Sequence, residues 1–339
     1  MKKTYKKVLA ILMIFGFVTT SLYAVTGKVS GAQMHEMPEW FKESFLDLQE
    51  DIEEAGESNK HVMLFLTLDA CPYCTKLLHD SFEKDSSVKT FIQKNFDVIG
   101  INIKGSREIA INENLTLTEK EYAKYLKVQY TPTVLFLNDK NEVVVRINGY
   151  RSSKNFQHIL NYVESKSYVD MTLTKYLEKA KDKTLYKLTQ NKLFSKVSDL
   201  SSVTQPLAVI FEDGGCTQCS YLHNVTLKNE EVKKELSKFT VVQLNASSNE
   251  IIINPKGEQT TPKKWAEELK LDYRPGIVLF DAQKEVIRID ALLYSFHFKE
   301  VFRYVSGGFY NQYTIFLDYL GIRQTELLNR GIDIDISDK

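Results

Sequence analysis

The sequence predicts an α/β protein made of two tandem units and a helical C-terminal tail. All four cysteines fall in two C-x-x-C pairs, and each pair follows a short apolar run that is typical of a buried strand. Farther along each half, Pro132 or Pro275 opens another apolar run, at a nearly equal distance from the cysteines. Repetition on this scale indicates duplication of a domain rather than a solenoid.

The first unit, predicted over residues 36–167, alternates strands and helices. A proline in the first turn of one helix and a capping box at the start of another favour helix initiation at those points. Two apolar runs separated by a short polar stretch predict a hairpin. The expected elements are strand His61–Leu68, helices Pro72–Phe82 and Val88–Asn95, strand Phe96–Ile103, helix Thr118–Leu126, strands Thr133–Leu137 and Glu142–Ile147, and helix Ser152–Glu164.

The second unit, predicted over residues 200–306, repeats this order. Its closest local match to the first unit is Tyr273-Arg274-Pro275, which corresponds to Tyr130-Thr131-Pro132. The expected elements are strand Leu207–Phe211, helices Cys216–Leu227 and Glu231–Lys238, strand Thr240–Leu244, a helix opened by Thr261-Pro262, strands Ile277–Phe280 and Glu285–Ile289, and helix Ser295–Val305.

Three further segments flank the units. A helix over Glu39–Ala55 precedes the first, and a helix over Tyr168–Leu193, in a connecting segment at 168–199, precedes the second. The tail at 307–339 is rich in tyrosine and phenylalanine, which predicts a helix docked on the body. Its last residues, Asp333–Lys339, are expected to be loose.

Residues 1–24 have the layout of a secretory signal peptide. Four lysines precede an apolar core at Val8–Val18, and small and polar residues lead to an expected cleavage site after Ala24. The apolar core is short for a membrane span, and an uncleaved anchor is the alternative. Export would place the mature chain in the periplasm, where disulfides form and persist.

Composition narrows the range of functions. A length of 339 residues favours about two domains, and 43% hydrophobic residues is usual for a soluble protein. Lys+Arg and Asp+Glu both total 44, so no net charge points to nucleic acid as a partner. No pattern in the chain indicates an oligomeric state.

The cysteine spacing indicates thiol–disulfide exchange. Two cysteines separated by two residues at a strand-to-helix junction can close a small disulfide, and the helix N-terminus stabilises the thiolate of the first. This applies to Cys71/Cys74. For Cys216/Cys219 two interpretations stay open: a second redox centre, or a stable disulfide in a domain kept for binding or shape. A four-cysteine zinc site shared by both pairs is a further alternative, which requires the two halves to meet.

The order of elements resembles the thioredoxin fold, with a central mixed sheet flanked by helices. The resemblance is carried by Cys71-Pro72-Tyr73-Cys74, by Thr131-Pro132-Thr133 and by the hairpin ending at Gly149. The leading Pro38–Phe41 and the insert Lys104–Leu117 look like exported thioredoxin-related proteins of the SoxW type.

The resemblance implies a role for each matched residue. Cys71 would be the nucleophile and Cys74 the resolving thiol. Pro132 would be a cis-proline facing them, and Thr131 would offer its backbone to a bound substrate strand. Arg274 and Pro275 would form the corresponding edge of the second unit, where Arg274 either favours the Cys216 thiolate or lies on the surface.

One departure concerns proton transfer. Thioredoxins carry a buried carboxylate six residues before the nucleophile, and Phe65 and Ile210 stand at that position here. The usual proton acceptor for the resolving thiol is therefore missing, with Asp69 or water as substitutes.

We expect a periplasmic thiol–disulfide oxidoreductase that acts on protein thiols and disulfides. It would use redox-active disulfides with no further cofactor and no metal. A reductase would need electrons from a membrane partner, because the periplasm lacks a glutathione buffer. Two alternatives are a binding or chaperone-like module, in which the second domain is a non-catalytic scaffold, and an adaptor in sulfur-compound oxidation.

Overall fold

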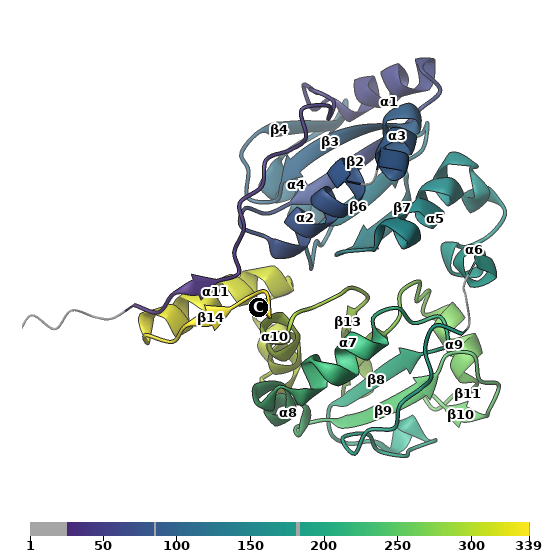
Figure 1. The fold of residues 1–339 in the computed structure, drawn as a ribbon, viewed down its shortest axis with the longest axis vertical. Coiled ribbons are helices and arrows are strands. Elements are labelled where there is room, and N and C mark those ends of the chain that lie inside the picture. The colour runs from purple at the N-terminus through teal and green to yellow at the C-terminus, as the bar shows by residue number, and fades with distance from the viewer. Residues whose placement is uncertain (1–25, 85, 181–183, 339) are drawn as a thin grey trace, which may run out of the picture.

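The computed structural model describes residues 26–84, 86–180 and 184–338, and the predicted signal peptide lies outside them. Two α/β domains lie one above the other, and the C-terminal helix lies beside the junction between them (Figure 1). Among the described residues, none of the helices combines the length and the apolar character needed to span a membrane.

The first domain is built on a four-stranded mixed sheet in the order β3-β2-β6-β7. Central β2 runs parallel to β3 and antiparallel to β6, and both of its faces are covered. Its apolar side chains therefore alternate between two cores, Met63 and Phe65 on one side and Leu64 and Leu66 on the other. The strands are β2 (His61–Thr67), β3 (Phe96–Asn102), β6 (Thr133–Leu137) and β7 (Val143–Asn148).

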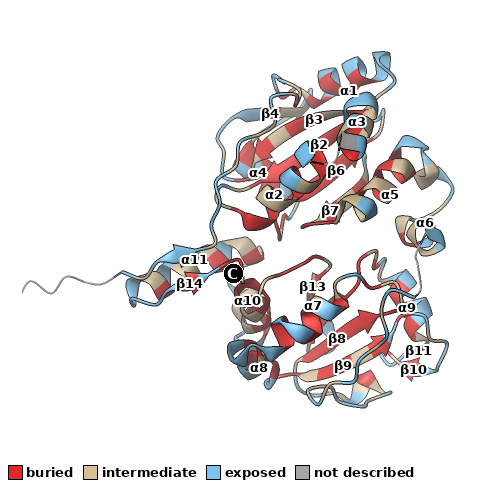
Figure 2. Ribbon diagram, viewed as in Figure 1, coloured by how far each residue is buried: buried red, intermediate tan, exposed pale blue. Residues whose placement is uncertain are grey.

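Helices cover both faces of this sheet (Figure 2). The helix that follows the first cysteine pair continues as a π-helical turn over Leu78–Lys84. The capping box of α4 is present as predicted, since Thr118 and Glu121 satisfy each other's backbone N–H groups. The helices are α1 (Leu48–Glu57), α2 (Pro72–Leu77), α3 (Ser86–Asn95), α4 (Glu119–Tyr125) and α5 (Ser153–Glu164).

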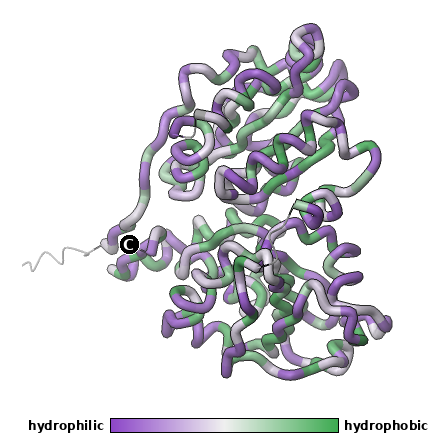
Figure 3. The backbone as a smooth tube through the Cα atoms, turned by 45° about the vertical axis from the view of Figure 1, so that its right-hand side comes forward, coloured by the Kyte–Doolittle hydropathy of each residue, from purple (hydrophilic) through white to green (hydrophobic). Residues whose placement is uncertain are grey.

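The second domain repeats the topology, with sheet order β13-β12-β8-β9. The predicted tandem α/β architecture is confirmed, and apolar segments run through the middle of both domains (Figure 3). The elements are β8 (Leu207–Glu212), α7 (Cys219–Asn224), α8 (Glu230–Leu236), β9 (Thr240–Asn245), β10 (Ile252–Ile253), β11 (Gln259–Thr260), α9 (Pro262–Glu268), β12 (Gly276–Asp281), β13 (Lys284–Ile289) and α10 (Ser295–Ser306).

Three segments differ from the sequence-based expectation. The first helix begins at Leu48 and not at Glu39, because Asp47 accepts hydrogen bonds from the first free N–H groups. Within the helix expected over Tyr168–Leu193, the described residues form α6 (Leu173–Ala180), and residues 184–199 contain no α-helix. The insert at 104–117 forms a hairpin of β4 (Glu108–Asn112) and β5 (Leu115–Thr118).

The expectation of a loose C-terminal end is wrong for its described residues. Strand β14 (Ile334–Asp335) pairs in parallel with β1 (Val29–Ser30) at the other end of the chain. The side chains of Ile334 and Ile336 are buried in the main core. These contacts join segments about three hundred residues apart, so no local sequence pattern reports them.

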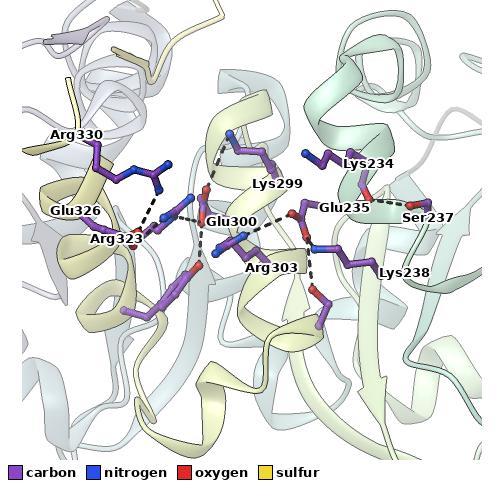
Figure 4. A network of polar contacts seen from close by, with 12 residues as sticks. Lys234, Glu235, Ser237, Lys238, Lys299, Glu300, Arg303, Arg323, Glu326 and Arg330 are labelled. Carbon is purple, nitrogen blue, oxygen red and sulfur yellow. Dashed lines mark hydrogen bonds and ion pairs between the residues drawn. The ribbon is translucent and has the colours of Figure 1, made fainter. Parts of the chain in front are cut away.

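A buried carboxylate joins α11 (Phe316–Asn329), the predicted tail helix, to α10 (Figure 4). Glu300 is 1% exposed, accepts a hydrogen bond from the Tyr319 hydroxyl at 2.8 Å, and lies 3.5 Å from Arg323 Nε. A buried charge is stable only with such partners. Nearly one turn farther along α10, Arg303 reaches Glu235 of α8 at 3.8 Å, which ties the helix to the second domain.

The two domains meet through equivalent residues that follow β7 and β13. The Asn148 side-chain amide donates to Asp290 at 3.0 Å, and Gly149 lies directly against Ala291. The equivalent residues Tyr130 and Tyr273 also each contact the other domain, since Arg151 lies over the Tyr273 ring and the Tyr130 hydroxyl donates to the Arg288 carbonyl. Equivalent surfaces that meet in this way give a two-fold-like interface within one chain.

Gly149 is predicted to be essential to this interface. Its φ of +69° is unfavourable for alanine by about 1–2 kcal/mol, and an added Cβ would lie 2.4 Å from the Ala291 Cβ. Gly149→Ala should therefore lower the free energy of unfolding by at least about 2 kcal/mol in thermal or urea denaturation. In the double variant Gly149→Ala/Ala291→Gly, the loss from the steric clash should be recovered and the loss from the unfavourable φ should remain. If the double variant instead loses the sum of the two single-variant losses, the two residues are not in contact.

Candidate functional site

The first cysteine pair lies where β2 ends and α2 begins. Cys71 is the N-cap residue of α2, and its Sγ accepts the backbone N–H of Cys74 at 3.1 Å. The two cysteines form a disulfide with Cα atoms 5.3 Å apart. Cys71 is 5% exposed and Cys74 is fully buried. The outer sulfur is thus the one that a reacting partner can reach.

The loop before β6 faces this disulfide, as the resemblance implies. The Thr131–Pro132 peptide bond is cis. The Thr131 hydroxyl donates to the Cys71 Sγ at 3.4 Å, and the Thr131 carbonyl oxygen lies 3.6 Å from the same sulfur. After reduction, this hydroxyl and the Cys74 N–H would both be in place to stabilise a thiolate at Cys71.

Tyr73, between the two cysteines, anchors the redox loop to the second domain. Its hydroxyl accepts the backbone N–H of Tyr294 and contacts His297 Nδ1, both at 2.9 Å. Its ring stacks on Tyr294 with centroids 4.9 Å apart. Burial lowers the pKa of His297 to about 4, so the imidazole is neutral at pH 7 and its Nδ1 can accept a hydrogen bond from the Tyr73 hydroxyl.

A hollow of about 430 Å³ opens onto Cys71, and both domains, the C-terminal tail and the N-terminal segment at Val29 and Ala32 line it. The first domain contributes the cysteine loop, Tyr130 and Thr131. The second domain contributes Ala291–Leu293, and the C-terminal tail contributes Leu320 and Ile336. The sequence predicted the cysteine side of this site, but none of the residues that line it from the second domain, the tail or the N-terminal segment.

The second cysteine pair is more enclosed. Cys216 and Cys219 form a disulfide with Cα atoms 5.6 Å apart, and they are 2% and 0% exposed. Helix α7 begins only at Cys219, so Cys216 is not at its N-terminus as predicted. A hollow of about 100 Å³ between the domains reaches the neighbouring Gly215 and Thr217.

Arg274 occupies the position equivalent to Thr131, and the bond between Arg274 and Pro275 is cis. The expectation that this arginine lies on the surface is wrong. It is buried rather than on the surface, and its Nε donates to Asp213 Oδ2 at 2.8 Å. Its Nη1 donates to the carbonyls of Leu271 and Tyr273. Arg274 therefore joins the loop before Cys216 to the loop before Pro275.

Polar groups that the sequence interpretation missed lie four residues before each first cysteine. Successive strand residues alternate faces, so Glu212 shares the inner face with Ile210, and Thr67 shares it with Phe65. Glu212 is fully buried and bonded to His223 Nε2 at 2.8 Å. The sequence does contain a signal for these groups, because a polar residue stands two positions after the place where thioredoxins carry their carboxylate.

In the first domain the corresponding imidazole is His35, from the N-terminal segment. Its Nε2 contacts the Thr67 hydroxyl at 2.8 Å, and its Nδ1 lies 3.3 Å from the hydroxyl of Thr75, which follows Cys74. Burial lowers the pKa of His35, against a smaller opposing effect of Asp69. Asp69 itself is exposed beside the hollow and accepts from the Asn102 amide.

Each cysteine pair is closed within its own domain, so the structure does not form the shared four-cysteine zinc site. In the parts of the chain that the structure covers, no three His, Cys, Asp or Glu side chains gather as a metal site.

Comparison with known proteins gives a family match over both domains. The model of the family described as "Thioredoxin-like domain" matches residues 48–164 and 195–306, which is more than half of the chain. A search of curated proteins found no match.

Among solved structures, similar chains include a thioredoxin-fold protein from Helicobacter pylori, at 22% identity and a TM-score of 0.32, covering 36% of this chain and 80% of that one. A thioredoxin from Thermus thermophilus shows 24% identity and a TM-score of 0.28, covering 34% and 83%. The first two thioredoxin domains of Saccharomyces cerevisiae Eps1p show 15% identity and a TM-score of 0.26, covering 74% and 93%.

The buried His297 predicts acid sensitivity of the fold. Its pKa is about 4 in the folded chain and near 6.5 when unfolded, so the unfolded chain binds more protons between these values. Stability should therefore fall as the pH falls, by about 2 kcal/mol from pH 7 to pH 5 through this group. In urea denaturation, the His297→Asn variant should lose about 2 kcal/mol less unfolding free energy than the wild type between pH 7 and pH 5. If both proteins lose the same amount, His297 is not the group responsible.

Proposed function

Because the chain belongs to the thioredoxin-like domain family, we propose that it is a thiol–disulfide oxidoreductase acting on protein substrates through Cys71 and Cys74. The observation that carries the proposal is the position of the Cys71 sulfur. It lies at a helix start beside the cis-proline loop and opens onto a hollow of about 430 Å³. An exchange-competent sulfur needs this combination of donors and access.

The exchange proceeds in two steps. The Cys71 thiolate attacks one sulfur of a substrate disulfide, forming a mixed disulfide and releasing the other substrate sulfur as a thiolate. Cys74 then loses its proton and attacks Cys71. The internal disulfide forms, and the second substrate sulfur leaves. The protein dithiol is oxidised as the substrate disulfide is reduced; the reverse sequence oxidises a substrate dithiol.

We propose that His35 accepts the proton that Cys74 loses in the second step. Phe65 replaces the usual carboxylate, whereas His35 contacts the turn that carries Cys74 through the Thr75 hydroxyl. Its lowered pKa keeps the ring neutral near pH 7, which is the form that accepts a proton. Asp69, the substitute considered from sequence, lies on the exposed side of the loop.

For Cys216/Cys219 we propose a second redox centre, supported by the repeated strand–C-x-x-C–helix order and by the buried Glu212–His223 pair. One observation favours a second candidate, in which the second domain is a non-catalytic scaffold. Its Ala291–Leu293 segment and His297 line the first site, and the Tyr294 N–H donates to the Tyr73 hydroxyl. Single-pair variants separate the two roles.

We propose that the protein works in the periplasm and that a membrane protein supplies its electrons if it acts as a reductase. The signal-like pattern at residues 1–24 supports export. A donor in the membrane is needed because the periplasm holds no thiol buffer from which the disulfide could be reduced. Fractionation of cells, with and without residues 1–24, tests the location; the protein staying in the cytoplasm in both cases would contradict it.

Removing each cysteine should have a distinct effect. Cys71→Ser should abolish reduction of insulin disulfides, because the attacking sulfur is lost, whereas Cys74→Ser should accumulate mixed disulfides on non-reducing gels. The double variant Cys216→Ser/Cys219→Ser is the matched control. Full rates in that variant make the second domain a scaffold, and a partial loss makes it a second centre. Full activity of Cys71→Ser would end the proposal.

His35→Gln should slow the resolving step and leave the first attack intact. We expect mixed disulfides to persist about tenfold longer at pH 7, with the difference narrowing above pH 8.5 as the thiol ionises unaided. Rapid acid quenching followed by mass spectrometry measures the lifetime of the mixed disulfide. An equal lifetime in both proteins across this pH range would show that His35 has only a packing role.

A further inference from the structure

The hollow at Cys71 continues into a second hollow of about 400 Å³ between the first domain and α11. The two share five lining residues: Leu68, Lys104, Leu317, Leu320 and Gln324. They therefore form one groove that begins at the Cys71 sulfur and ends against α4. We call it the α11 groove.

The walls of the α11 groove are apolar and face each other. Leu68, Ile103 and Val128 line it from the first domain, and Leu317 and Leu320 line it from α11. The Glu300 contacts hold α11 in place on α10, so this wall is fixed to the second domain. A groove closed on two sides admits a single extended chain and excludes the broad surface of a folded protein.

The charged residues of the distal half are mostly positive. Lys104, Lys120 and Lys124 line it, and Asp318 is the one acidic residue lining it. Lys120 and Lys124 are one helical turn apart on α4, so they share a face. Within the described residues none of the three lysines forms an ion pair, and all three are exposed. An acidic group in the groove would meet these cations without first breaking an internal pair.

We propose that the α11 groove binds an extended cysteine-bearing segment of a substrate protein, with apolar residues near the cysteine and acidic residues farther along. The proposal rests on the proposed exchange at Cys71 and names the class of substrate for it. The cysteine would lie at the Thr131 end, apolar side chains between Leu68 and Leu320, and carboxylates at the lysines.

A glycine leaves space in the groove. Gly321 lies within α11 and lines the distal half, and a Cβ added there would meet no heavy atom within 4 Å. Glycine is a poor helix former, so a larger residue at this position favours the helix and fills the groove. Gly56 of α1 is a matched control, since it is also helical and has equally open space.

The test uses the reduced full chain and six-residue peptides whose cysteine is capped as a neutral pyridyl disulfide. Oxidation of Cys71/Cys74 releases the peptide thiol and pyridine-2-thione, whose absorbance gives the rate. The peptides share an apolar core and differ only in an acidic or a basic end. Each rate is divided by that for dipyridyl disulfide, which reports Cys71 chemistry without using a peptide segment.

We expect the acidic peptide to react at least tenfold faster than the basic one at low salt, and the ratio to fall as salt is added. The triple variant Lys104→Glu/Lys120→Glu/Lys124→Glu should invert the ratio. The control Lys94→Glu/Lys140→Glu/Lys256→Glu makes the same change in charge at exposed lysines outside both hollows and should keep it. Gly321→Trp should lower the normalised rates of both peptides about tenfold, whereas Gly56→Trp should leave both rates unchanged.

Equal rates for the acidic and basic peptides, or the same ratio in both triple variants, would overturn the groove while leaving the exchange chemistry in place. If a capped acidic tripeptide reacts as fast as the six-residue peptide, the proposal of an extended segment is also wrong, and the groove binds a small anionic thiol compound instead. If the wild-type protein reduces neither the peptides nor dipyridyl disulfide, the proposed function itself fails.

Discussion

The contact between Gly149 and Ala291 is the constraint on which the first site depends. The two residues occupy equivalent places after the last sheet strand of each domain, and they meet with no room for another atom. This contact brings Ala291–Leu293 over the cis-proline loop of the first domain. The edge that a lone thioredoxin unit would leave open is therefore one wall of a groove. Access to Cys71 is set by the way the domains are joined as much as by the cysteine loop.

The same interface affects the two disulfides differently. In the first domain, Thr131 presents a hydroxyl and a carbonyl to Cys71, and the hollow above them is wide. In the second, Arg274 fills the equivalent place and is held by Asp213. Breaking that buried pair would leave an uncompensated charge, which is costly. A near-symmetric fold thus supports one disulfide that opens onto a wide hollow and one that is more enclosed, which fits unequal roles for the two domains.

Much of the fold was predictable from sequence because its signals are local. The buried strands, the capping box at Thr118 and the two hairpins follow from patterns within a few residues. The cysteine pairs and Pro132 were predictable for the same reason. The start of α1 was missed although Asp47 is a good N-cap, because the apolar pattern around Trp40 and Phe41 was interpreted as helical. Those two rings instead pack on Phe82.

The rest of the site was not predictable, because it is made by segments distant in sequence. The groove wall comes from α11, and β14 pairs with β1 across almost the whole chain. That pairing also has a chemical consequence. His35 follows β1 by only a few residues and reaches the turn after Cys74 from there. In the second domain the corresponding imidazole, His223, is supplied by α7 itself. In the first domain this imidazole comes from a segment outside the domain itself. The proton acceptor that we propose for Cys74 is therefore in place only while the two ends of the chain stay paired.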